Sequence, residues 1–190
     1  MRIQKQRFFL VENMEINGRH FESYLSPEDI KRIINTLADQ LNQDYEGKEV
    51  IVISVLKGAF IFCADLVREL NFDLEIEFLR LSSYGSGMRS SGKIKEMAGL
   101  QVPLQGKEVL IVEDIVDTGL TLDWLRDTLG RHEPSSLKLV TLLYKAEAFQ
   151  GNHPPEYVGR TIPNKFVVGY GLDFDEKGRE LKGIFKVMAE

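Results

Sequence analysis

Apolar segments that lack a polar face constrain the fold of this chain most. Residues 49–56 (EVIVISVL) are β-branched and apolar on both alternating faces, and residues 107–112 (KEVLIV) form another apolar segment of the same kind. Residues 136–144 (SLKLVTLLY) follow as a third strand-like run. Strands that are covered on both faces are typical of parallel sheets between two layers of helices. We therefore expect an α/β fold.

Helical patterns alternate with these strands. Residues 27–42 follow a hydroxyl cap at Ser26, begin with proline and two acids, and continue with isoleucine and leucine at helical spacing. Residues 59–70 and 122–129 fit helices that follow strands, and residues 73–81 alternate polar and apolar residues as a strand does. This order predicts a mostly parallel, twisted sheet with helices on both faces.

The other segments are less regular. Residues 82–100 are dense in glycine and serine without an apolar period, which predicts a long loop of the kind that often forms a lid. We expect irregular structure before residue 26 and over residues 145–165, and short strands at 166–170 and 183–188. A length of 190 residues fits one domain, or a compact core with an appended subdomain.

Composition excludes several classes of partner. The chain has 29 acidic and 24 basic residues and a net charge of −5, so it has no overall field that attracts nucleic acid or an anionic membrane. The longest apolar stretch is too short to span a bilayer, and the N-terminal run is too short for a signal peptide. We expect a cytoplasmic protein. The single cysteine, Cys63, lies in an apolar segment and is expected to be a buried structural thiol.

The segment most informative about chemistry is VLIVEDIVDTGLT, residues 109–121. A buried strand leads into an acidic stretch and then into the start of a helix. Ligands of open parallel sheets bind beyond the carboxyl ends of strands, and a helix N-terminus offers free amides and partial positive charge to a phosphate. We interpret the end of this segment as a cradle for a monophosphate, formed by Asp117, Thr118, Gly119, Leu120 and Thr121.

Two acids precede the cradle. Glu113 and Asp114 are suited to accept hydrogen bonds from the two neighbouring hydroxyls of a ribose. From the acids alone, a solvated surface with a helix cap is an equally open interpretation; the apolar strand before them favours the site. The chain has no G-x-x-x-x-G-K-[ST] motif, and its glycines at 85, 87 and 92 do not fit the dinucleotide fingerprint.

The whole pattern resembles a known family. VLIVEDIVDTGLT resembles the phosphoribosyl-pyrophosphate motif of the type I phosphoribosyltransferases. Four further motifs match the hypoxanthine-guanine branch in order: VLKGAF (55–60), SSYG (82–85), LLYK (142–145) and KFVVGYGLDF (165–174). The resemblance implies a single domain with a core over about residues 26–165. It also implies a small hood, built from the N-terminal residues and residues 166–190, and a flexible lid over about 82–100.

The resemblance also implies an activity. The 5-phosphoribosyl group would pass from phosphoribosyl pyrophosphate to a 6-oxopurine, hypoxanthine or guanine, giving IMP or GMP and pyrophosphate in purine salvage. Mg²⁺ would be the cofactor, because a few carboxylates and substrate oxygens suit this ion, and the chain would form a homodimer or homotetramer. An RNA-binding regulator with the same fold and a phosphoribosyltransferase for orotate or adenine are alternatives. Net acidity argues against the first, and the LLYK and KFVVGYGLDF motifs against the second.

Individual roles follow from the matched motifs. Asp117 corresponds to the general base that takes a proton from the purine N7. The purine would be read by Lys145 at its 6-oxo group, stacked on Phe166 and contacted by the backbone of Val167. Without the resemblance, Lys145 would be taken as a solvated lysine and Phe166 as a core residue. The family's lid residues correspond to Ser83 and Tyr84.

The leaving group has its own matched residues. Lys57 and Gly58 would donate backbone groups to pyrophosphate, and in the family the peptide bond before Lys57 can be cis. Arg179 would contact the same group, and Asp173 would be a carboxylate ligand of the metal, which Glu113 and Asp114 approach through the ribose hydroxyls. Taken alone, Arg179 and Asp173 fit ordinary surface turns. Leu120 departs from some relatives, which carry a basic residue there.

Overall fold

The computed structural model describes residues 13–83, 94–98, 100 and 102–188, with the backbone alone for residues 82, 83 and 94–98. In this part of the chain, the strands form two sheets. The strands of the larger sheet are β3 (Glu49–Leu56), β4 (Asp73–Ser83), β5 (Ile94–Ala98), β6 (Glu108–Val116), β7 (Ser136–Tyr144) and β8 (Tyr157–Thr161). The sheet has the order β5-β4-β3-β6-β7-β8, and all pairs except the antiparallel β4–β5 pair are parallel.

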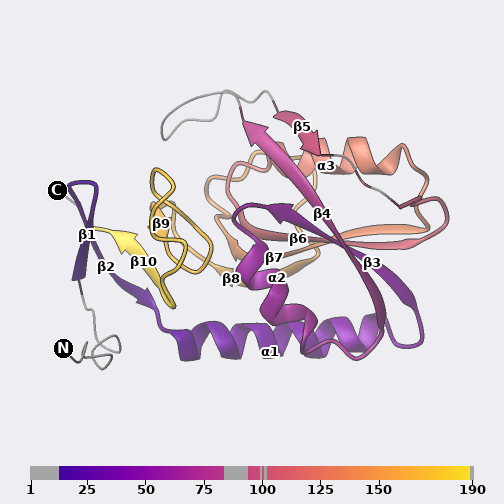
Figure 1. Cartoon of the computed structure of the whole chain (residues 1–190), viewed down its shortest axis with the longest axis horizontal. Coiled ribbons are helices and arrows are strands. Elements are labelled where there is room, and N and C mark those ends of the chain that lie inside the picture. Colours follow the sequence, from indigo (N-terminus) through magenta and orange to yellow (C-terminus); the bar gives the residue numbers. More distant parts are fainter. Residues whose placement is uncertain (1–12, 84–93, 99, 101, 189–190) are drawn as a thin grey trace, which may run out of the picture.

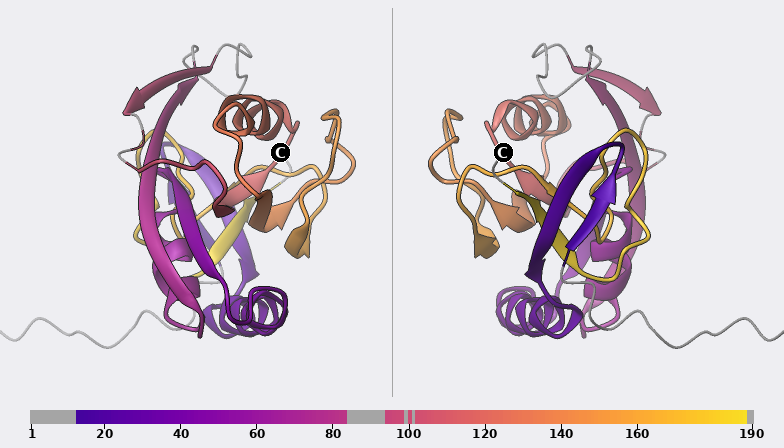
Figure 2. Two further views of the ribbon diagram at one scale, coloured as in Figure 1. Left: turned by 90° about the vertical axis from the view of Figure 1, so that its right-hand side faces the viewer. Right: turned by 90° about the vertical axis from the view of Figure 1, so that its left-hand side faces the viewer.

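Helices cover both faces of this sheet, as the apolar strands predict. The helices α1 (Pro27–Asp44) and α2 (Phe60–Val67) pack in one core cluster with alternate residues of β3 and β6. The helix α3 (Leu120–Gly130) packs in a second cluster with the other alternate residues. Figure 2 shows α1 and α3 on opposite sides of the sheet. The α/β class with a mostly parallel sheet is confirmed.

The long helix α1 begins where the sequence predicts. The Ser26 side chain accepts a hydrogen bond from the Asp29 amide (3.1 Å), and the Ser26 amide donates to the Asp29 carboxylate (3.0 Å). This capping box satisfies amides that a helix start leaves free. Ile30, Ile34 and Leu41 lie on the buried face. None of the helices in the described part of the chain is long and apolar enough to cross a membrane.

A second sheet lies at one end of the molecule (Figure 1). It contains β1 (Asn13–Ile16), β2 (Arg19–Leu25), β9 (Val167–Val168) and β10 (Ile184–Val187), in the order β1-β2-β10-β9, with all pairs antiparallel. A tight turn at Asn17 and Gly18 joins β1 to β2, and both residues have positive φ (49° and 78°). Asn-Gly is the favoured pair for such a hairpin turn, because both residues tolerate this conformation.

Four strands differ from the expectations. The irregular start contains the β1–β2 hairpin, the long loop contains β5, and residues 145–165 contain β8. The strands β5 and β8 were missed because each is a short edge strand fixed by pairing with β4 or β7 rather than by a strong pattern of its own. The predicted helix 59–70 is shorter, ending at Val67, and the predicted strand 166–170 is reduced to the pair of residues in β9.

The strand order indicates where a ligand should bind. The chain passes from β3 to β4 on one side, and β6 then adds on the other side of β3. The order therefore reverses between β3 and β6, and ligands of open α/β sheets bind beyond the carboxyl ends of strands at such a reversal. The strand β3 ends at Leu56 and β6 ends at Val116, so the two segments that follow them meet at this position.

Candidate active site

The adjacent acids lie inside a strand rather than beyond its end. The predicted strand over residues 107–112 continues as β6 to Val116, because β7 pairs with it along this length, for example at Glu113 opposite Thr141. Glu113 is buried (8% exposed) and Asp114 is half-buried. Two carboxyl groups are thereby fixed on a rigid element at the carboxyl edge of the sheet.

Both acids resist ionisation. Burial raises the pKa of Glu113 well above its usual value, and the charge of Asp114 raises it further. Burial also raises the pKa of Asp114, against the opposing effect of a hydrogen bond from the Ile115 amide (2.9 Å) and the nearby positive charge of Arg179. A low-dielectric site with a neighbouring like charge disfavours the carboxylate form. The pair is therefore suited to bind hydroxyl donors or a cation.

The segment after β3 contacts Asp114 directly. A Cβ atom added at Gly58 would lie 1.7 Å from Asp114 Oδ2, so only glycine allows this approach. The peptide bond between Leu56 and Lys57 is cis, and the Lys57 ammonium forms an ion pair with Glu176 (2.8 Å). The predicted leaving-group segment and one predicted ribose acid thus lie in contact.

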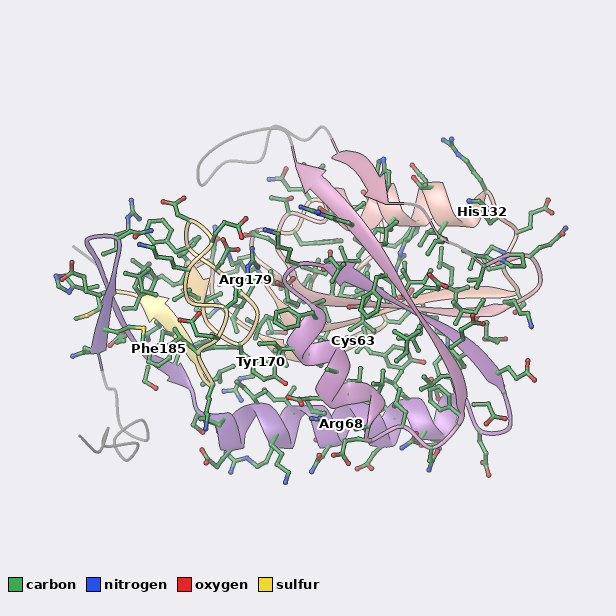
Figure 3. All side chains as sticks on the ribbon, in the orientation of Figure 1. Cys63, Arg68, His132, Tyr170, Arg179 and Phe185 are labelled. Atoms are coloured by element: carbon green, nitrogen blue, oxygen red, sulfur yellow. The ribbon has the colours of Figure 1, made fainter. Side chains whose placement is uncertain are left out.

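Arg179 lies on the segment between β9 and β10, residues 169–183, which we call the C-terminal segment. This segment reaches the same position. The Arg179 guanidinium donates to the Gly171 carbonyl (2.8 Å) and pairs with Asp173 (2.7 Å), while its charge acts on Asp114. Its Nε atom is buried without a hydrogen-bond partner among the described residues. A buried guanidinium donor without a partner is costly unless a ligand completes it. Figure 3 shows Arg179 on the C-terminal segment.

The residues of the predicted phosphate cradle lie at the start of α3. Gly119 lies at the N-terminal cap of α3 with φ of 86°, and no side chain caps this end. The first helical bond runs from the Asp123 amide to the Gly119 carbonyl (2.9 Å), so the amides before Asp123 have no partner within the helix. Thr118 is exposed, and Thr121 is half-buried. Leu120, the residue that departs from some relatives, is 46% exposed.

A loop that the sequence did not single out supports the cradle. A Cβ atom at Gly119 would lie 2.4 Å from the Phe149 ring and 3.1 Å from the Gly151 amide. The Gln150 amide also donates to the Thr118 carbonyl (2.9 Å). The loop after β7 therefore packs directly against the turn that precedes α3. No local pattern indicates this packing, because it depends on the spatial proximity of β6 and β7.

The predicted base and the predicted purine lysine form an ion pair. Lys145 Nζ lies 2.6 Å from Asp117 Oδ2, and Lys145 is 6% exposed while the Asp117 side chain is 45% exposed. The Lys145 amide donates to the Val116 carbonyl (2.9 Å), which fixes the lysine beside the end of β6. The interpretation of Lys145 as a solvated strand-end lysine is therefore wrong.

The predicted purine-binding residues Phe166 and Val167 lie in or near the second sheet. Phe166 is half-buried, and its ring contacts Phe21 and Phe174 at centroid distances of 6.3 and 5.6 Å. Val167 is buried and pairs with Lys186 of β10. Of the predicted lid residues, Tyr84 lies outside the described residues, and Ser83 is described only as the last backbone position of β4.

Comparison with known proteins assigns the class. The family model of the phosphoribosyl transferase domain matches residues 20–175, and the chain therefore belongs to this family. A hypoxanthine-guanine phosphoribosyltransferase from Aquifex aeolicus is 44% identical over 174 residues, which cover 91% of this chain and 98% of that protein. A hypoxanthine phosphoribosyltransferase from Haemophilus influenzae is 42% identical over 90% of this chain and 97% of that protein.

Comparison with solved structures supports the same family. A crystal structure of a hypoxanthine-guanine phosphoribosyltransferase from Bacillus anthracis has a TM-score of 0.83 and 44% sequence identity, covering 88% of this chain and 98% of that chain. A hypoxanthine phosphoribosyltransferase from Staphylococcus aureus has a TM-score of 0.83 and 39% identity, covering 88% of this chain and 91% of that chain. The resemblance to the hypoxanthine-guanine branch is confirmed.

Proposed function

We propose that this enzyme transfers the 5-phosphoribosyl group of phosphoribosyl pyrophosphate to hypoxanthine or guanine, giving IMP or GMP and pyrophosphate. The observation that carries the proposal is the ion pair of Lys145 with Asp117 between the acid pair of β6 and the uncapped start of α3. The position combines a phosphate-binding helix start, acceptors for sugar hydroxyls and one cation–carboxylate pair for a base. This combination fits a nucleoside monophosphate product.

Binding of the sugar follows from this arrangement. The 5′-phosphate would accept hydrogen bonds from the amides around Gly119 and from the hydroxyls of Thr118 and Thr121. Glu113 and Asp114 would accept hydrogen bonds from the ribose hydroxyls. Because the acid pair is buried and its pKa values are raised, two hydroxyl donors stabilise its charged form.

Transfer requires one bond to form and one to break. A ring nitrogen of the purine forms a bond to C1′ of the ribose while the bond from C1′ to pyrophosphate breaks, and the proton on N7 passes to the Asp117 carboxylate. Lys145 would donate to the 6-oxo group, which a 6-amino base lacks. The stacking role of Phe166 is supported by its half-buried ring, and the backbone of Val167 would border the base.

The leaving group would be held from two sides. Gly58 lies against Asp114, and backbone groups at Lys57 and Gly58 would bind pyrophosphate from this side. Arg179 Nε, which has no partner among the described residues, would offer a charge-assisted donor to a pyrophosphate oxygen. Closure of the segment that contains Ser83 and Tyr84 over the sugar remains part of the proposal, because exclusion of water protects an oxocarbenium-like sugar.

The carboxylates also suit a divalent metal, for which we propose Mg²⁺. No cluster of three or more metal-binding side chains occurs among the described residues, so a cage made by protein alone is absent there. The donor set instead offers Asp173 and the buried pair Glu113 and Asp114, and hard cations such as Mg²⁺ bind through one or two carboxylates plus substrate oxygens. When bound, the ion would neutralise the charge that develops on pyrophosphate.

A turnover assay tests the proposal. The protein is mixed with phosphoribosyl pyrophosphate, Mg²⁺ and one base at a time, and ultraviolet absorbance follows product. We expect turnover with hypoxanthine or guanine and none with adenine or orotate. Turnover with adenine or orotate alone would contradict the proposal. The expected homodimer or homotetramer is tested separately by analytical ultracentrifugation, where a monomer at micromolar concentration would contradict it.

A further inference from the structure

The C-terminal segment that carries Arg179 and Asp173 is attached to the segment after β3 at two points. The first point is the site itself, where a Cβ atom at Gly171 would lie only 2.1 Å from the Gly58 carbonyl oxygen. The second point lies behind the site, where the Tyr170 hydroxyl donates to the Asp65 carboxylate of α2 (2.5 Å). Both contacts join the same two segments, since α2 begins just after Gly58.

Tyr170 occupies an unusual position for a residue with a side chain. It has φ of 52° and lies between Gly169 and Gly171, whose φ values are 107° and 98°. A left-handed backbone is unfavourable for most residues other than glycine, and such strain persists where the surroundings require it. The presence of an aromatic side chain between two glycines therefore indicates that the side chain itself contributes to the arrangement.

The surroundings of Tyr170 indicate that its hydroxyl, and not packing of the ring alone, holds the side chain in place. The side chain is buried (6% exposed) but borders a cavity of about 480 Å³ between α1, α2 and the C-terminal segment. Close packing therefore does not surround the ring on all sides. Burial and the Asp65 carboxylate raise the pKa of Tyr170, so the hydroxyl remains protonated and donates. Figure 3 shows Tyr170 on the C-terminal segment and Arg68, the residue that follows the end of α2.

We propose that the Tyr170–Asp65 hydrogen bond positions the pyrophosphate-binding groups, by fixing the segment of Asp173 and Arg179 against the segment of Gly58. Tyr170 is thus a positioning residue that acts through Gly171, whose carbonyl accepts from Arg179 (2.8 Å). The inference rests on the proposed function, because it assigns the two segments to the leaving group. It makes binding of phosphoribosyl pyrophosphate, rather than of the base, dependent on a contact behind the site.

The test uses Tyr170→Phe, which removes one oxygen atom, together with Asp65→Ala and Asp65→Asn. We expect the KM for phosphoribosyl pyrophosphate, at saturating Mg²⁺, to rise about tenfold in Tyr170→Phe and Asp65→Ala. The KM for the base and kcat should stay within about twofold of wild type. Asp65→Asn retains an oxygen acceptor and should recover most of the affinity. The double variant should resemble either single variant, because both remove one interaction.

A matched control exists in the same chain. The Tyr157 hydroxyl donates to Asp44 at the end of α1 (2.6 Å), and Tyr157 is the first residue of the edge strand β8, which β7 separates from β6. Tyr157→Phe also removes a tyrosine–aspartate hydrogen bond, so it should lower the urea midpoint without changing either KM. Arg68 pairs with Asp65 but is largely exposed, and Arg68→Ala should leave both KM values unchanged.

The outcomes separate the two claims. Wild-type KM for phosphoribosyl pyrophosphate in Tyr170→Phe would overturn the inference while leaving the proposed function intact. An equal rise of both KM values in Tyr170→Phe would also overturn it, because that result indicates general loosening. If wild-type protein neither turns over 6-oxopurines nor binds inorganic pyrophosphate by calorimetry, the proposed function fails and the inference fails with it.

Discussion

Glu113 and Asp114 destabilise the folded chain when they are ionised and no ligand is bound. They are adjacent in β6, Glu113 is buried, and their pKa values lie above the usual range. The site therefore holds unfavourable charge until a ligand provides donors or positive charge. Such an arrangement is common at functional sites, where binding rather than stability determines the residue.

This charge gives the stability of the ligand-free protein a defined pH dependence. A carboxyl whose folded pKa is raised favours folding below its unfolded pKa near 4, and this contribution is lost as pH rises through the folded pKa, about 6 for Asp114. We expect Asp114→Asn to stabilise the ligand-free protein by about 1 to 3 kcal/mol at pH 7.5, and by roughly a third of that at pH 4.5, which lies between the unfolded and folded pKa values.

Urea unfolding of both proteins at the two pH values measures this difference. Asp127→Asn is the control, because Asp127 is an exposed acid on α3 and its substitution should change stability by about 0.5 kcal/mol or less at either pH. Equal stability of wild type and Asp114→Asn at pH 7.5 would show that burial of the pair is not costly.

A second prediction concerns the pair of Asp117 and Lys145. Asp117→Asn keeps the shape of the side chain but removes the proton acceptor, so kcat should fall by about 10² to 10⁴-fold. Affinity for GMP, measured by calorimetry, should change little because the amides of the cradle remain. The side-chain oxygen of asparagine can still accept a hydrogen bond from Lys145. The variant should therefore lose only the proton transfer, and not the contact with Lys145. Wild-type turnover in this variant would remove Asp117 from the role of base.

Among the elements, the start of α3 depends most on one residue. Gly119 has positive φ, and an added Cβ atom would meet the Phe149 ring and approach the Gly151 amide. Gly119→Ala should therefore distort the cradle and weaken binding of GMP at least tenfold. Gly130, at the other end of the same helix, has no atom within 4 Å of an added Cβ. Gly130→Ala should keep GMP affinity and add up to about 1 kcal/mol of stability.

Calorimetry with GMP compares the two glycine variants. Wild-type affinity in Gly119→Ala would mean that the phosphate does not bind at the start of α3. A loss of affinity in Gly130→Ala would mean that the helix as a whole, rather than its first turn, controls binding.

Local sequence patterns predict some of the helices and strands but not others. The helix α1 and the strands β3, β6 and β7 were predictable because their apolar periods and caps are local. The β1–β2 hairpin carries a usable signal in Asn17-Gly18, which the prediction did not use. The edge strands β5 and β8 could not be predicted this way, because pairing with β4 and β7 determines them.

At the scale of the molecule, the segment between β9 and β10 meets the segment that follows β3. The β6–α3 motif was predictable from the sequence, and the structure has its acids inside β6 and Gly119 at the start of α3. The binding roles of these residues stay predictions. The hydrogen bond from Tyr170 to Asp65 joins residues 105 positions apart and forms only when the C-terminal segment folds against α2, so no local pattern predicts it. The division into a core over residues 26–165 and a hood stays a prediction.

The most direct test of the account is a crystal structure of the protein with GMP and Mg²⁺. We expect phosphate oxygens within about 3.2 Å of the backbone amides that precede Asp123 at the start of α3. We also expect the ribose hydroxyls to donate to Glu113 and Asp114, and the 6-oxo group to accept from Lys145 Nζ. A phosphate bound away from α3, or acids that face only solvent in the complex, would contradict it.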